Sequence, residues 1–261
     1  MFYKFMGGCD DSLVEIFEKA VMQGSVRFAS VAHFNDPYEF KFTPVIPSRE
    51  TFDRWHDVHD PQRPARERAD AWTNCNGSAW DYNTGFTPRL ELMRHMYLLC
   101  LTQRWDSHLM WGHYASQYRG FVVCYKPDLV SALPGMSGWI GHGKVTYDDQ
   151  VPELRWFSAP VGEMMKPTLL TKSDQWAYEA EYRALLCDDA DQAGILRSID
   201  PGLIAGVILG PRVPEALIAK AIAYRATNSD FSVDQLSSRH DSYELTTRVV
   251  QDNVRVFGAF L

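Results

Sequence analysis

Two unbroken runs of apolar residues constrain this chain more than any other sequence feature. They cover residues 97–102 (YLLCLT) and 121–125 (FVVCY), and each has the length of one β-strand. Because strand side chains alternate between two faces, an unbroken apolar run predicts a strand that is buried on both faces. Between the runs, Asp106 and Ser107 are typical of a helix start and Gly120 of a stop, which predicts a helix over residues 109–118.

The remaining pattern predicts a mixture of helices and strands. Ser12 and Glu15 form a capping box for a helix that Gly24 would end, and Pro214 begins a helix that extends to Tyr224. Strands are predicted over residues 26–29, 144–147, 203–209, 244–250 and 254–260, and a glycine-rich loop over 135–143. We therefore expect one α+β domain over residues 1–261, with helices interrupting a largely β core and a polar insertion of helix and loop at about 47–88.

Charge and cysteine content restrict the class of protein. The chain has 33 acidic and 26 basic residues, a net charge of -7, so no overall positive field would attract a nucleic acid. Its five cysteines have no C-x-x-C spacing, and three lie in apolar runs, which indicates buried free thiols in a reducing compartment. The start of the chain does not resemble a secretion signal, and no apolar run has the roughly 18 residues of a membrane span. We expect a soluble, cytoplasmic protein with no membrane partner.

The segment 176–186 (WAYEAEYRALL) carries the most informative charges. If it is a strand, Glu179, Glu181 and Arg183 share one face, with the two carboxylates roughly 7 Å apart. Such a pair suits a reaction that builds positive charge on a sugar carbon, because one carboxylate stabilises the cation while the other helps to activate the acceptor. If the segment is a helix, Glu179 and Arg183 form only an ordinary i, i+4 ion pair.

Two further segments could contact a ligand. In the helix over 109–118, Trp111, His113 and Tyr114 offer rings and polar groups of the kind that bind a nucleotide base or nicotinamide, although so aromatic a helix is also typical of a core. In residues 33–39 (HFNDPYE), Asn35 and Asp36 could clamp a ligand or simply hydrogen-bond their own backbone in a turn.

Motifs of the common enzyme classes are missing. The sequence contains no G-x-G-x-x-G, G-x-x-x-x-G-K-[ST], H-E-x-x-H or G-x-S-x-G. His56, Asp57 and His59 could approach a metal ion, but no second cluster completes a ligand set, and a solvated polar turn is the alternative. We predict no metal.

Taken together, the ordered motifs resemble a known family. The chain is similar to the bacterial family catalogued as domain of unknown function 2971, a resemblance that implies no established activity. It rests on residues 3–5 (YKF), 34–39 (FNDPYE), 100–102 (CLT), 110–115 (MWGHYA), 120–123 (GFVV), Lys172, and Trp176 with Glu179, Glu181 and Arg183.

A more distant resemblance is to the ADP-ribosyltransferase superfamily. Tyr3 and Lys4 match the first strand of that superfamily, residues 24–28 match its next strand, and Glu179 with Glu181 match its late E-x-E motif. The superfamily also has a serine or tyrosine motif in the middle of the chain, for which Thr102 or Tyr114 could stand in. The resemblance implies a split, mostly antiparallel β core with flanking helices, and NAD bound in a cleft between two small sheets. It also implies a toxin, effector or phage-defence protein, with a possible inhibitor or antitoxin partner.

The resulting hypothesis is an enzyme that transfers ADP-ribose from NAD or hydrolyses NAD. Glu181 would be the catalytic carboxylate and Glu179 would orient the acceptor or the ribose. Trp111, His113 and Tyr114 would contact rings, Tyr3 would contact the cofactor, Asn35 and Asp36 would hold its polar groups, and Arg183 or Lys4 would neutralise the pyrophosphate. The acceptor could be a protein, a nucleic acid or water.

Two alternatives remain. In the first, the chain is a non-catalytic binding module whose aromatic helix and E-x-E segment are core and salt-bridge network. In the second, Glu181 and His113 hydrolyse nucleic acid, although the net charge offers no basic groove. A cavity that joins Tyr3, His113 and Glu181 would favour the enzyme over the binding module.

Overall fold

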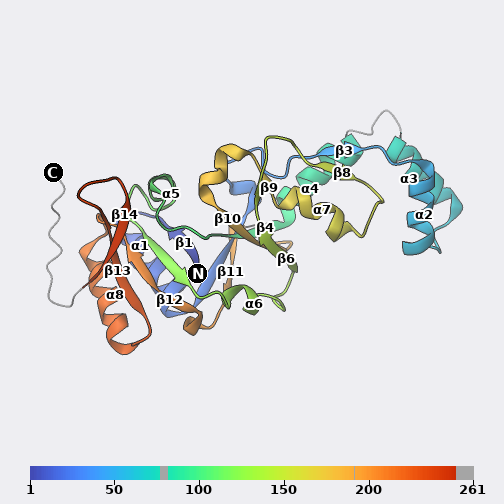
Figure 1. Cartoon of the computed structure of the whole chain (residues 1–261). Helices are drawn as coiled ribbons and strands as arrows, with labels where there is room; N and C mark the ends of the chain where they lie inside the picture. Colours follow the sequence, from blue (N-terminus) through green and yellow to red (C-terminus); the bar gives the residue numbers. More distant parts are fainter. Residues whose placement is uncertain (77–81, 191, 251–261) are drawn as a thin grey trace.

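The strands of this chain form one large sheet, with helices against its faces (Figure 1). The computed structural model describes residues 1–76, 82–190 and 192–250. Over these residues the large sheet has ten strands, and every pairing in it is antiparallel except that of β12 with β13. The chain is a single-domain α+β protein with a mostly antiparallel sheet, as its sequence predicts. The strands are β1 (Phe2–Met6), β2 (Ser25–Ser30), β4 (Met96–Thr102), β5 (Phe121–Tyr125), β6 (Trp139–Lys144), β10 (Glu181–Cys187), β11 (Gly194–Ser198), β12 (Ile204–Leu209), β13 (Ser232–Ser238) and β14 (Leu245–Val249).

Short elements complete the chain. Two small parallel pairs lie outside the large sheet, β3 (Thr43–Val45) with β8 (Glu153–Arg155) and β7 (Thr146–Tyr147) with β9 (Thr171–Lys172). The α-helices are α1 (Asp10–Phe17), α2 (Arg49–His59), α3 (Ala65–Asn76), α4 (Thr87–His95), α5 (His108–Tyr114), α6 (Leu129–Ala132), α7 (Val161–Leu169) and α8 (Glu215–Thr227). Short 3₁₀ and π turns are η1 (Glu18–Met22), η2 (Val31–His33), η3 (Tyr82–Phe86), η4 (Asp174–Glu179) and η5 (Pro201–Leu203). No helix of the described residues is long and apolar enough to cross a bilayer.

Strand β4 is the branch point of the large sheet. One edge of β4 pairs along its whole length with β10. In the described part of the chain, its other edge pairs with β2 at Tyr97 and Leu98 and with β1 at Thr102. The strands β1 and β2 therefore diverge, and the sheet is open beside Cys100, between these two pairings.

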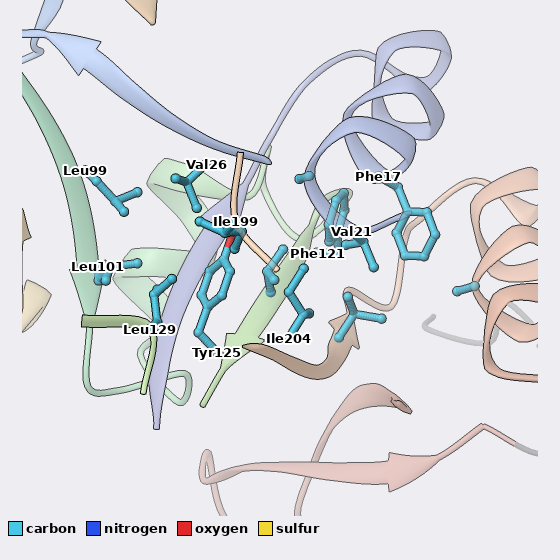
Figure 2. Packing of buried hydrophobic residues seen from close by; sticks show 14 of the residues in the cluster. Phe17, Val21, Val26, Leu99, Leu101, Phe121, Tyr125, Leu129, Ile199 and Ile204 are labelled. Atoms are coloured by element: carbon cyan, nitrogen blue, oxygen red, sulfur yellow. The ribbon is translucent and has the colours of Figure 1, made fainter. Parts of the chain in front are cut away.

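Both apolar runs are buried on both faces, which confirms the prediction from their composition. Leu99 and Leu101 of β4 join Phe121 and Tyr125 of β5 in the main core, against Phe17 of α1 (Figure 2). The alternate residues of the two strands enter two other clusters, one beside α7 and one beside α5. Alternation along a strand thus fills a different core on each side.

Several element boundaries differ from the sequence expectation. Helix α1 begins at Asp10, and Ser12 forms no capping box because its Oγ donates to the Cys9 carbonyl. Gly24 does end this helical region, as predicted, and its φ is +62°. Helix α5 ends at Tyr114 rather than at residue 118, because residues 116–118 all have positive φ. The predicted loop 135–143 is partly wrong, since β6 pairs there with β10. β11, β13 and α7 were not predicted, and the strand predicted over 254–260 lies outside the described residues.

The predicted polar insertion contains α2 and α3, which lie at the end of the molecule far from α8 (Figure 1). His56 of α2 is 1% exposed, and its Nδ1 lies 2.9 Å from the Phe52 carbonyl oxygen. Its ring packs against Phe52 and Phe157. His56 is thus part of a small aromatic core rather than a solvated turn, and across residues 1–76, 82–190 and 192–250 no three His, Cys, Asp or Glu side chains are grouped to hold a metal ion.

Candidate active site

A cavity of about 420 Å³ lies where β1 and β2 diverge from β4. Its walls come from these three strands, from the loop after β2, from α5 and from the segment between Lys172 and Glu181. Tyr3, His113 and Glu181 all line it. Its volume is in the range that accommodates a small molecule or a nucleotide.

The two glutamates of the E-x-E motif reach this cavity by a route that the sequence does not predict. Glu179 is the last residue of η4, a 3₁₀ turn, and Glu181 is the first residue of β10. Ala180 between them has φ of 43° and ψ of 49°, a left-handed conformation that few residues other than glycine adopt. The strand alternative for this segment therefore holds only from Glu181 onward. The left-handed residue, and not strand alternation, brings the two carboxylates to one cavity.

Glu181 is an ionised carboxylate held by a guanidinium. Arg183 donates to both of its oxygens, from Nε at 3.0 Å and from Nη2 at 3.1 Å, as the predicted shared face of the strand requires. The backbone N–H of Glu181 donates to the Tyr147 hydroxyl at 2.7 Å. Burial acts to raise the pKa of Glu181, but Arg183 and then Lys172 outweigh it and hold that pKa below its usual value. Glu181 is thus charged at neutral pH.

Glu179 has the opposite pKa shift. Its Oε1 accepts a 2.5 Å hydrogen bond from Tyr114, and its Oε2 accepts one of 2.8 Å from Lys172. Burial nevertheless dominates and raises the pKa of Glu179. Burial and the neighbouring carboxylate also raise the pKa of Tyr114, so this hydroxyl keeps its proton and donates a hydrogen bond to Glu179. Asn35 in turn donates to the Tyr114 hydroxyl at 3.2 Å.

Lys172 connects the acidic groups, although no role was predicted for it from the sequence. Its Nζ lies 2.8 Å from Glu179, 3.4 Å from Glu39 and 3.8 Å from Glu181. Burial acts to lower the pKa of Lys172, but the three carboxylates raise it above its usual value. Glu39, which was also not predicted, accepts hydrogen bonds of 2.8 and 3.0 Å from Arg183. No local pattern could have identified these pairs, since Glu39 and Arg183 are 144 positions apart.

Seven of the ten predicted site residues line the cavity: Tyr3, Lys4, Asn35, His113, Tyr114, Glu179 and Glu181. The structure also adds Arg27 to the lining. Its only sequence signal is a charged residue between the apolar Val26 and Phe28 of the predicted strand.

The other three predicted residues do not line the cavity, so the contacts predicted for them are not supported. Trp111 is 0% exposed and donates from Nε1 to the Trp105 carbonyl, and its ring packs edge-on against Phe5, as the core alternative requires. Arg183 is also 0% exposed, and its donors are taken by Glu39, Glu181 and a backbone carbonyl, so it cannot reach a pyrophosphate. Asp36 accepts the N–H of Tyr38 in a turn and lines a separate cavity of about 230 Å³.

No protein-family model, curated protein or solved structure matches this chain.

Proposed function

We propose that this chain is an ADP-ribosyltransferase-like enzyme that binds NAD in the cavity and breaks its nicotinamide–ribose bond. The observation that carries the proposal is the pair of carboxylates with opposite pKa shifts, Glu179 and Glu181, beside aromatic rings in one cavity. Groups with divergent pKa values in a cleft are typical of acid–base sites. The open sheet at β4, between β1 and β2, also agrees with the split core that the superfamily resemblance implies.

Each carboxylate has a separate role in this reaction. When the bond from the ribose carbon to the nicotinamide nitrogen breaks, its electron pair leaves with neutral nicotinamide, and the ribose carbon becomes an oxocarbenium ion. Ionised Glu181 stabilises that positive charge. Glu179, whose raised pKa makes it a better base near neutral pH, accepts the proton of the attacking acceptor or water. Arg183 and Lys172 position the two carboxylates.

Ring contacts come from α5 and β1. His113 is exposed at the cavity, and its Nδ1 lies 3.1 Å from the Tyr178 hydroxyl, which holds the imidazole in one orientation. Tyr3 lines the cavity from β1. Both offer flat surfaces to nicotinamide or adenine.

A binding module is the second candidate, and one observation favours it. Both glutamates are only 4% exposed, and both are paired with cations. Paired carboxylates can serve as a structural network alone, with the cavity holding a ligand that it does not convert.

The deciding experiment is incubation of the protein with NAD and detection of free nicotinamide. We expect the wild-type protein to release nicotinamide, and E181Q to fold and bind NAD while its rate falls by about 10²- to 10⁴-fold. The matched control is E163Q on the exposed surface of α7, which should leave the rate unchanged. Wild-type turnover by E181Q would contradict the role of Glu181. NAD binding without any release by the wild type would favour the binding module.

A further inference from the structure

The cationic side chains of the cavity are unequally paired. Lys172 is surrounded by three carboxylates, as described above. Lys4 and Arg27 also line the cavity, yet neither forms an ion pair with any acidic side chain in the described part of the chain. Two unpaired cations in one cavity create a local field that favours an anion, despite the net negative charge of the whole protein.

Lys4 lies at the opening of the sheet. Its Nζ donates a 3.1 Å hydrogen bond to the Cys100 carbonyl, which lies in the stretch of β4 between its pairings with β1 and β2. An ammonium group has three N–H donors, so two remain available to a ligand. Burial lowers the pKa of Lys4, with a smaller contribution from the charge of Arg27, although Cys100 and Glu181 act to raise it.

Arg27 lines the same cavity from β2. Its Nη2 donates at 2.8 Å to the Ala193 carbonyl, while a guanidinium carries five N–H donors in all. The side chain is exposed, so a ligand reaches it without any rearrangement. Continuing the antiparallel register of Ala29 with Leu98 brings Arg27 level with Cys100, the residue that Lys4 contacts.

We propose that Lys4 and Arg27 form a subsite for the phosphoryl groups of a nucleotide, between β1 and β2. Glu181 lines the same cavity, and its partner in the sheet, Thr102, lies two residues along β4 from Cys100. The choice of NAD as the nucleotide rests on the proposed function, and Arg27 then joins Lys4 in the pyrophosphate contact that the sequence predicts for Arg183 or Lys4.

The test is calorimetric titration of the wild-type protein, R27Q, R27K and K4Q with ADP and with adenosine. We expect ADP to bind the wild type at least about tenfold more tightly than adenosine, because charge-assisted hydrogen bonds recognise the phosphates. R27Q and K4Q should each weaken ADP binding by about tenfold and leave adenosine unchanged, with R27K intermediate. The matched control is R66Q on the exposed surface of α3, which should bind ADP as the wild type does.

Two results would overturn the subsite: no binding of ADP by the wild type, or wild-type affinity for ADP in both R27Q and K4Q. Lys4 also donates to a backbone carbonyl, so thermal melting must show that K4Q is folded. If K4Q does not fold, R27Q alone tests the subsite, because Arg27 is an exposed side chain. The nicotinamide assay keeps the two proposals separable. Release by the wild type together with unaffected ADP binding in the variants rejects only the subsite. Weakened ADP binding in R27Q, with no release by the wild type, rejects only the reaction.

Discussion

The hydroxyl of Tyr114 donates a 2.5 Å hydrogen bond to Oε1 of Glu179, joining residues 65 positions apart. The bond connects α5 to η4, and it satisfies one oxygen of a carboxylate that is only 4% exposed. Lys172 satisfies the other oxygen. Glu179 is therefore oriented from two sides by side chains of two different segments.

Removal of this hydroxyl should impair the reaction more than the fold. In Y114F the ring remains, but Glu179 loses a donor, so its pKa should rise further and its orientation should relax. A hydrogen bond to a charged group contributes about 1.5–3 kcal/mol, which corresponds to a loss of about 10- to 100-fold in nicotinamide release. The control is Y243F, because Tyr243 is 92% exposed. Equal rates for Y114F and the wild type would show that Tyr114 does not support Glu179 during the reaction.

Ala180 should tolerate glycine and reject valine. A left-handed conformation costs an L-residue about 1–2 kcal/mol of conformational energy, whereas glycine adopts it freely. Glycine in turn lowers the free energy of unfolding by about 0.4–1 kcal/mol, because it has greater freedom in the unfolded chain. We expect A180G to be as stable as the wild type or slightly more stable in urea denaturation, with full activity. A180V should be less stable and less active, because a β-branched residue disfavours this φ and the two glutamates would lose their alignment. A stable and fully active A180V would show that the left-handed turn is not needed.

Loss of Arg183 should destabilise the protein strongly. R183M leaves Glu39 and Glu181 buried without their shared partner, and breaking a buried ion pair in this way costs about 3–5 kcal/mol of unfolding free energy. R183K should not restore stability, because an ammonium lacks the planar fork that reaches both carboxylates and the Leu169 carbonyl. The exposed pair of Arg54 with Glu50 provides the control, and R54M should change urea stability little. An effect of R183M no larger than that of R54M would contradict the structural role of this network.

The two glutamates should give opposite dependences of stability on pH. The folded-state pKa of Glu181 is lowered, so its charge stabilises the fold above the ordinary value near 4.5, and this contribution is lost as the pH falls. The folded-state pKa of Glu179 is raised, so its contribution is complete below that value and is lost as the pH rises through the folded-state pKa. Urea denaturation between pH 3.5 and pH 7 should therefore show the wild type losing stability relative to E181Q on acidification, and relative to E179Q as the pH increases. Slopes of the same sign for both comparisons would contradict the assigned shifts.

Much of the fold follows from local sequence. The apolar runs of β4 and β5 predict strands buried on both faces, because the identity of each residue and the period of a strand suffice for that conclusion. The polar strand β13, by contrast, has no strong alternation and was missed, since its pairing with β12 and β14 depends on residues distant in sequence. The capping box at Ser12 was wrong because the backbone had already entered the helix at Asp10.

For the site, local sequence indicates which chemical groups are present: two carboxylates with one residue between them, a guanidinium two positions further on, and an aromatic helix. Which of these groups line the cavity depends on the folded arrangement of the strands and helices. That arrangement buries Trp111, encloses Arg183 between Glu39 and Glu181, and places Arg27 and Lys172 in the lining. The physical reason is that periodicity assigns a side chain to a face of its own element only, whereas the pairing of charges depends on which strands become neighbours. The left-handed backbone of Ala180 also depends on the tertiary structure, because an alanine adopts this conformation only where surrounding contacts offset its energetic cost.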